Sequence, residues 1–237
     1  MESQLHRYRP QLETTSWFRG LPAALRDYMV SHARLVHLKK GQVLYCCGDQ
    51  ADGLYAVLEG ALAIGTVGVD GKEALLAVLG PTAWIGEISL FDRLPRPHDA
   101  TAVGRVVLLY VPEAALLGLL DSTPAYWRDL ALLMAQRLRL SFKNAEALTL
   151  LPAAQRLANR LLMIAEGYDG LNATRRTIKI SQDSLAAMAS LSRQTTNQLL
   201  KRLESQQVIA LRFGEIAILD VERLRAASVG DVDRAQP

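Results

Sequence analysis

The sequence predicts an α+β fold, in which an N-terminal antiparallel β-roll leads into one long helix and then a C-terminal winged helix-turn-helix. Three observations predict this order. Short apolar runs separated by glycines fill much of the first half, an uninterrupted heptad pattern follows, and two cappable helical segments precede a pair of alternating runs. The length of 237 residues suits one or two domains, each able to bury a core.

The composition is that of an ordinary globular protein, with 50% hydrophobic and 22% charged residues. No apolar run approaches the roughly 20 residues that cross a bilayer. Residues 1–7 also lack the basic-then-apolar order of a signal peptide. We therefore expect a cytoplasmic protein with no membrane partner.

The β-roll is predicted from about residue 35 to residue 111. Its strands are expected in the Leu-rich or β-branched runs 54–58, 61–64, 74–79 and 106–111, with glycines and Gly-Pro pairs between them. The Asp70-Gly71 pair separates two of these runs, and such a pair is a strong signal for a hairpin. Short strands with turn signals at this spacing indicate an antiparallel barrel or roll.

The only cysteines, Cys46 and Cys47, are adjacent in the sequence. We interpret them as two small residues in a strand, and a thiol redox sensor is the alternative. Neighbouring cysteines rarely form a disulfide, and two thiols alone are too few for a structural zinc site or an iron–sulfur cluster. No metal site is therefore expected.

The long helix is predicted over residues 124–150. Asp121-Ser122-Thr123 provides a cap, Pro124 suits the first turn, and no glycine or proline follows before Leu151-Pro152. Seven residues repeat in alternating steps of four and three, as in a two-stranded coiled coil: Trp127, Ala131, Met134, Leu138, Ser141, Ala145 and Leu148. A helix of this length, about 37 Å, is expected to form a homodimer interface, and packing on its own roll is the alternative.

Leu151-Pro152 is the predicted domain boundary and hinge, followed by an amphipathic segment over residues 153–166. The expected domains are therefore an effector-sensing roll (1–123), the dimerisation helix (124–150) and a DNA-binding domain (151–237).

A helix-turn-helix is predicted between residues 181 and 204. Ser181 is placed to cap a first helix and Ser192 a second, with a three-residue turn between the first helix and the second cap. The inward-facing residues are expected to be Leu185, Met188, Thr196, Leu199, Leu200 and Leu203. Alternating runs at 208–212 and 215–219 then predict a wing, which a polar surface helix of another protein class would lack.

The second of these helices has one face with the residue types that read base edges in double-stranded DNA. Arginine pairs with guanine and Asn or Gln with adenine, and we expect uncapped hydroxyls at Ser181 and Thr195 to contact phosphates. Residues 172–212 also carry seven basic side chains against two acidic ones. The predicted DNA contacts are Ser181, Ser192, Arg193, Gln194, Thr195, Asn197, Gln198 and Lys201.

Over residues 17–226 the chain resembles the cyclic-AMP receptor protein/FNR (Crp/Fnr) family of bacterial regulators. The matching motifs are residues 48–60 of the roll, Trp84-Ile85-Gly86-Glu87-Ile88-Ser89-Leu90-Phe91 at the phosphate-cassette position, and the recognition helix at 191–200. The resemblance implies a cyclic-nucleotide-binding-like roll and a homodimer whose effector lies between roll and long helix. It also implies RNA polymerase as a partner.

The effector pocket departs from the pattern of cyclic-AMP binders in this family. Their cassette runs from Gly-Glu to Arg-Ser-Ala, and the Arg and Ser hold the cyclic phosphate. This chain keeps Gly86 and Glu87 but has His98-Asp99-Ala100 at the second position, and Phe142 replaces the second of two helix hydroxyls. The predicted effector residues are Gly86, Glu87, Ile88, Ser89, Arg96 as a substitute arginine, His98, Asp99, Ser141 and Phe142.

These departures argue against cyclic AMP as a high-affinity effector, because neutral histidine and anionic aspartate suit a cyclic phosphate poorly. Three alternatives stay open. The effector is cyclic di-GMP or another cyclic nucleotide, or the pocket is empty in a constitutively active dimer, or, as a minor option, the protein binds haem.

The recognition helix also departs from the family pattern. The family's Arg-Glu and later Arg are replaced by Arg193-Gln194 and Gln198. We therefore expect a palindromic operator with an altered half-site.

The alternative function is that of a cyclic-nucleotide-binding regulatory module acting on a protein partner. An enzyme is not expected, because the sequence has no P-loop, no G-x-S-x-G and no H-E-x-x-H motif. The four histidines, His6, His32, His37 and His98, are scattered over the first hundred residues.

Overall fold

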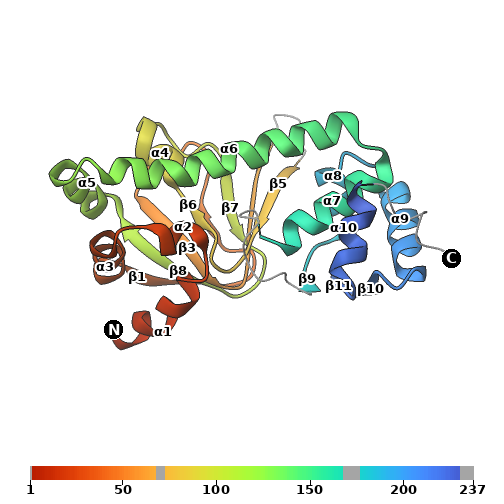
Figure 1. Cartoon of the computed structure of the whole chain (residues 1–237), viewed down its shortest axis with the longest axis horizontal. Helices are drawn as coiled ribbons and strands as arrows, with labels where there is room; N and C mark the ends of the chain where they lie inside the picture. Colours follow the sequence, from red (N-terminus) through yellow and green to blue (C-terminus); the bar gives the residue numbers. More distant parts are fainter. Residues whose placement is uncertain (1, 68–72, 168–176, 230–237) are drawn as a thin grey trace. The chain divides into compact units, whose positions relative to one another are not determined.

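A computed structural model describes residues 2–67, 73–167 and 177–229 (Figure 1). The chain divides into two compact units, Met1–Leu138 and Arg139–Pro237. The α+β class with a β-roll, one long helix and a winged helix-turn-helix is confirmed. Helix α6 (Tyr126–Leu150) contributes residues to both units. Among the described helices, none has the length and apolar character needed to cross a bilayer.

The first unit contains two four-stranded antiparallel sheets, as the glycine-punctuated runs predicted. One sheet has the order β1 (Arg34–Leu38), β8 (Val106–Pro112), β3 (Gly53–Glu59) and β6 (Trp84–Ile85). The other has the order β2 (Val43–Tyr45), β7 (Asp99–Ala102), β4 (Leu62–Val67) and β5 (Glu73–Leu79). Strands β4 and β5 pair as a hairpin, with Val67 opposite Glu73. The predicted Asp70-Gly71 turn itself lies outside the described residues.

Five further helices of the first unit were not predicted from the sequence. They are α1 (Glu2–Leu12), α2 (Ser16–Gly20), α3 (Ala23–Ser31), α4 (Glu87–Asp92) and α5 (Glu113–Ser122). Thr15 caps α2 by accepting from the amide of Phe18. Phe18 stacks on Trp84 with ring centroids 5.5 Å apart, and Trp17 meets Trp84 edge-on at 5.3 Å. These aromatic contacts pack helix α2 against strand β6.

Helix α6 begins at Tyr126, so the predicted start at Pro124 is wrong by two residues. The preceding helix α5 extends to Ser122, and a turn closes when the amide of Tyr126 donates to the carbonyl of Thr123 at 3.1 Å. Trp127, the first residue of the heptad pattern, then packs edge-on against Phe91 at 5.1 Å.

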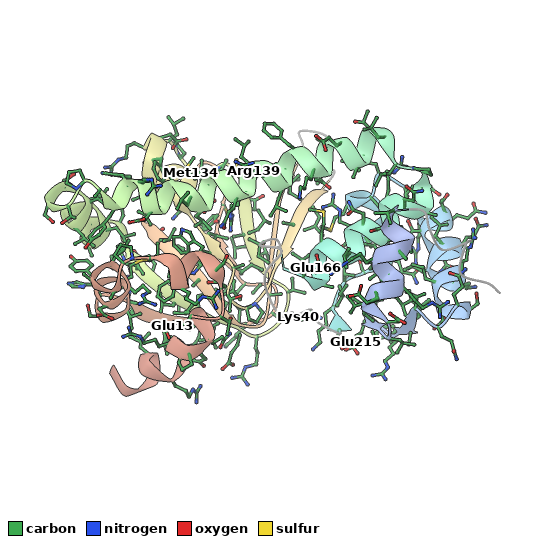
Figure 2. The ribbon with its side chains drawn as sticks, viewed as in Figure 1. Glu13, Lys40, Met134, Arg139, Glu166 and Glu215 are labelled. Carbon is green, nitrogen blue, oxygen red and sulfur yellow. The ribbon has the colours of Figure 1, made fainter. Side chains whose placement is uncertain are left out.

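The second unit is built from helices α7 (Ala153–Ala165), α8 (Gln182–Met188), α9 (Arg193–Ser205) and α10 (Val221–Val229) with the three-stranded sheet β10-β11-β9 (Figure 1). Strand β9 (Thr177–Ile178) pairs with β11 (Glu215–Ile218), which pairs with β10 (Ile209–Arg212). Helix α7 confirms the predicted amphipathic segment, whereas α10 was not predicted. Arg225 of α10 forms an ion pair with Glu166 at the end of α7, which Figure 2 labels.

Candidate effector pocket and DNA-binding face

The phosphate-cassette segment begins with a glycine that no other residue can replace without strain. Gly86 joins β6 to α4 with φ of +101°, in the left-handed region that favours glycine. A Cβ atom here would lie 2.6 Å from the carbonyl oxygen of Gly53 and 2.8 Å from Nη1 of Arg96. Gly86 therefore allows the cassette backbone to approach both β3 and the Arg96 side chain.

Arg96 lies beside the cassette, but its guanidinium already holds protein oxygen atoms. The side chain is 1% exposed. It donates to Asp52 Oδ1 at 2.6 Å, to the Gly53 carbonyl at 2.8 Å and to the Gly86 carbonyl at 3.2 Å. Its guanidinium carbon also lies 4.6 Å from the ring centre of Tyr45. The carboxylate of Asp52 thus neutralises the guanidinium of Arg96, which was predicted to face an anionic effector.

Tyr45 and Tyr55 flank this buried arginine. Burial raises the pKa of Tyr45 to about 12, and the positive charge of Arg96 opposes this rise. Burial, together with the hydrogen bond that its hydroxyl donates to Asp52, also raises the pKa of Tyr55 well above that of a free tyrosine. Both phenols are consequently neutral at physiological pH.

Glu87 of the cassette has a charged partner, which was not predicted from the sequence. The Glu87 side chain is 3% exposed, and its Oε1 lies 3.1 Å from Nη1 of Arg137 on α6. Neither carboxylate oxygen makes a well-aligned hydrogen bond with the described residues. Arg137 also donates to the backbone carbonyl of Trp84. One feature of the sequence could have indicated Arg137. It lies four residues, about one helical turn, before Ser141, which was predicted to contact the effector.

The remaining cassette residues differ in orientation. Ile88 is 41% exposed, whereas Ser89 is 1% exposed, and its Oγ has no hydrogen-bond partner among the described residues. Buried polar atoms in proteins normally have a partner, in protein, water or ligand. The Ser89 hydroxyl and the Glu87 carboxylate are therefore the cassette groups with unused hydrogen-bonding capacity.

The segment that replaces the Arg-Ser-Ala motif is tied to the roll. Asp99 begins β7, and its Oδ1 accepts a hydrogen bond from the Cys47 amide at 2.7 Å, while His98 is partly exposed. The placement of Cys46 and Cys47 in a strand is wrong. They lie in the turn after β2, are free and exposed, and Cys47 Sγ lies 3.4 Å from the Pro97 carbonyl.

The two effector residues predicted on the long helix belong to the second unit, and the cassette belongs to the first. Ser141 is exposed, and Phe142 is 59% exposed. Within the described parts of the chain, no three His, Cys, Asp or Glu side chains are grouped to hold a metal ion.

The helix-turn-helix has the caps and the turn that its sequence predicts. Ser181 caps α8 by accepting from the Ser184 amide, and Ser192 caps α9 by accepting from the Thr195 amide, both at 3.0 Å. Ser190 turns the chain between the helices with φ of +51°. Arg160 of α7 is buried and donates to the carbonyl of Met188 at 2.6 Å, which holds the end of α8 against α7.

Helix α9 buries one edge and exposes the predicted DNA edge. Thr196, Leu200 and Leu203 are buried, and Leu199 is partly buried. Four of the predicted contacts within α9 are exposed, namely Arg193, Gln194, Gln198 and Lys201. Arg193 lies 3.4 Å from Asp183, but both side chains are more than 60% exposed, and the pair is weakly held.

Four of the predicted DNA contacts form hydrogen bonds within the protein: Ser181, Ser192, Thr195 and Asn197. Asn197 donates to Oε1 of Gln182 at 2.9 Å and so links α9 to α8. The expectation of uncapped hydroxyls at Ser181 and Thr195 is wrong. The Ser181 hydroxyl is the α8 cap and also contacts Ser184, and the Thr195 hydroxyl lies 2.8 Å from that of Ser192.

The wing predicted after α9 is present as strands β10 and β11. Arg212 pairs with Glu215, which Figure 2 labels, and Phe213 and Gly214 form the turn. The amide of Leu211 donates to Oε1 of Glu204 on α9 at 2.8 Å. This hydrogen bond fixes the wing to the recognition helix close to the turn, one residue before the end of β10.

Comparison with known proteins identifies both parts of the chain. Residues 35–123 match the family described as cyclic nucleotide-binding domain, and residues 155–227 match the Crp-like helix-turn-helix domain. The CRP-like cAMP-activated global transcriptional regulator of Mycobacterium tuberculosis is 29% identical over 209 residues, covering 87% of this chain and 93% of that protein. The cyclic AMP receptor protein of Thermus thermophilus is also 29% identical, over 90% of this chain and 96% of its own length.

A solved structure supports the same assignment. A CRP/FNR-family transcriptional regulator from Thermus thermophilus has a TM-score of 0.64 and 27% identity, covering 83% of this chain and 98% of that chain. The roll, the helix-turn-helix and the order of the two matched domains agree with these relatives. The chain is therefore a DNA-binding transcription regulator of the non-enzymatic Crp/Fnr family, with a cyclic nucleotide-binding effector domain.

Proposed function

We propose that the regulator binds a palindromic operator as a homodimer, with one α9 helix in the major groove of each half-site. The observation that carries this proposal is the exposed polar edge of α9, formed by Arg193, Gln194, Gln198 and Lys201 opposite its buried apolar edge. A two-fold symmetric dimer places its recognition helices about 34 Å apart, one turn of DNA.

The residue types on this edge predict which bases are read. Arg193 at the exposed N-terminus of α9 suits guanine, because its guanidinium can donate to both acceptors on the major-groove edge. Gln194 and Gln198 favour adenine over the cytosine and guanine that Glu and Arg would read. The expected half-site is therefore richer in A·T pairs than that of relatives with the Arg-Glu-Arg pattern.

The proposed dimer interface is the heptad seam of α6. Leu138 is 55% exposed in the single chain, and the adjoining Phe142 is 59% exposed. Met134, another seam residue, is labelled in Figure 2. Burying such side chains stabilises an interface by about 1.5–3 kcal/mol each. A second copy of the same helix supplies a matching seam because the four–three repeat is continuous from Trp127 to Leu148.

We further propose that the effector is not cyclic AMP. Both arginines beside the cassette are already paired, Arg96 with Asp52 and Arg137 with Glu87. Holding the cyclic phosphate with an arginine of the pocket, as cyclic-AMP binders of the family do, would therefore break an existing ion pair. Asp99 at the former Arg-Ser position adds a negative charge to the same place. Cyclic di-GMP or another cyclic nucleotide is the proposed effector, and a constitutively active, ligand-free dimer is the competing arrangement.

Isothermal titration calorimetry on the purified protein tests the effector assignment. Cyclic AMP, cyclic GMP and cyclic di-GMP would be titrated separately into the same preparation. We expect cyclic AMP to give no micromolar binding, and a micromolar dissociation constant for it would overturn this part of the proposal. Binding of none of the three, with operator binding retained, would favour the constitutive dimer.

Selection of duplexes from a random pool tests the operator assignment, followed by fluorescence anisotropy on the selected site. Arg193→Ala is expected to lower affinity by about 1–3 kcal/mol and to relax one base position per half-site. Arg223→Ala is the matched control, because it removes the same charge from an exposed position on α10. Equal binding by the wild type and Arg193→Ala would mean that α9 does not read bases in this register.

A location and one further partner follow from this role. A regulator of bacterial transcription acts on the chromosome, so we propose a cytoplasmic location and contact with RNA polymerase at the promoter. Transcription assays with purified polymerase, with the operator placed upstream or over the promoter, would distinguish activation from repression.

A further inference from the structure

Phe213 is a large apolar side chain held at the tip of the wing, fully in solvent. Its relative exposure is 107%, the highest among the exposed large hydrophobic residues of the described chain. The side chains that alternate inward along β11, Ile216 and Ile218, are buried. The hairpin therefore has its own apolar side, and Phe213 takes no part in it.

The fold does not require an aromatic residue at this position. The conformational demand of the turn falls on Gly214, whose φ is +67°, in the left-handed region. Phe213 is not among the residues with positive φ, so a small polar residue would fit the same backbone. An exposed phenyl ring forfeits the stabilisation that burial of such a side chain provides.

The wing tip is positioned relative to the recognition helix. Leu211 is hydrogen-bonded to Glu204 of α9, and the four residue pairs from Ile209–Ile218 to Arg212–Glu215 make a continuous ladder out to the turn. Leu211 lies only two residues before Phe213, a span of about 7 Å. Glu204 lies about one helical turn beyond Lys201, so the wing tip lies beside the end of the α9 edge proposed to carry the duplex.

Resting on the DNA-binding mode proposed above, we infer that Phe213 enters the minor groove flanking the half-site and packs against its walls. The minor groove lies next to the major groove along the duplex, and phenylalanine is one of the side chains that wedge into base steps there. Arg212, the residue before Phe213, has a side chain that is 71% exposed and lies 3.7 Å from Glu215, and it would contact a phosphate next to the groove. The contact would favour flanking steps that unstack readily, such as TA and CA/TG.

The test measures operator affinity and base stacking together. Operators from the selection experiment would carry 2-aminopurine at successive positions in the flanks, and its fluorescence rises when the base unstacks. With the wild type we expect a rise at one flanking position per half-site. Phe213→Ala should abolish that rise and weaken binding roughly tenfold, whereas Phe213→Trp should preserve both.

Leu219→Ala is the matched control, since Leu219 is an exposed apolar residue (54%) of the same unit that lies outside the turn. It should leave affinity and fluorescence unchanged. Unaltered affinity in Phe213→Ala, or no flanking fluorescence change with the wild type, would overturn the inference while leaving operator binding intact. Failure of the wild type to select any DNA sequence would instead refute the proposed function.

Discussion

The buried carboxylate of Glu87 lies 3.1 Å from the guanidinium of Arg137, so that an ion pair joins the cassette to the long helix within the first unit. The two residues are fifty positions apart in the sequence. Removing Arg137 would leave Glu87 buried and without a counter-charge, which is more harmful than removing both charges.

We therefore expect Arg137→Met to lower the free energy of unfolding by about 2–4 kcal/mol, somewhat less than for a fully buried pair because Arg137 is 26% exposed. The double variant Glu87→Gln/Arg137→Met should recover part of this loss, since the uncompensated charge is gone. Urea unfolding followed by circular dichroism would measure both. Additive losses in the double variant would show that the two side chains are not coupled.

A charged residue in the exposed seam of α6 should prevent dimerisation. Leu138→Lys would bring two like charges together across a symmetric interface, and we expect a monomer by light scattering after size exclusion. Leu132→Lys is the control, because Leu132 is also exposed (46%) on α6 but lies off the seam. A monomeric wild type, or a dimeric Leu138→Lys variant, would place the interface elsewhere.

Ser190 should become more stable as glycine. Its φ of +51° is a conformation that an L-residue with a Cβ atom adopts at a cost, and glycine adopts it freely. Ser190→Gly is expected to raise the free energy of unfolding by about 0.5–1 kcal/mol. Ser205→Gly, the same chemical change at the helical end of α9, should lower it instead. Chemical denaturation of the two variants would compare the signs directly.

Alkaline pH should destabilise the roll through its buried phenols. Burial raises the pKa of Tyr45 from 10 to about 12, so the folded state holds this proton in a range where the unfolded state has lost it. The stabilisation is complete below pH 10 and is lost as pH rises from 10 to 12. Tyr45→Phe should reduce the decline in unfolding free energy between pH 9.5 and about 11.5, by up to 2 kcal/mol.

Equilibrium unfolding in urea at several pH values would give the two slopes. An unchanged slope in the variant would mean that Tyr45 ionises as readily in the folded protein as in the unfolded chain.

Much of the architecture was readable from local patterns. Apolar runs with glycine punctuation predicted strands β3, β4, β5 and β8 of the roll. The four–three repeat predicted α6 to within two residues, and Ser181 and Ser192 predicted the caps. These features depend on residues close together in the sequence, where a repeat of 2 or 3.6 positions, or a capping hydroxyl, acts directly on the backbone. The resemblance of the motifs then identified the family.

Helices α1 to α5 and the C-terminal α10 escaped prediction. Helices of five to eleven residues have too few turns for a clear period, and their stability comes from tertiary packing. The contact of Phe18 and Trp17 with Trp84, for example, joins segments more than sixty residues apart.

The sequence alone determined the order of roll, long helix and winged helix-turn-helix, and the residue types on the exposed edge of α9. Only the tertiary structure decided which polar groups are already engaged: Arg96 by Asp52 and two carbonyls, Glu87 by Arg137, and Asn197 by Gln182. The physical reason is that periodicity reports the face on which a side chain lies. Its hydrogen-bonding partner depends on which distant segment the fold brings to that face.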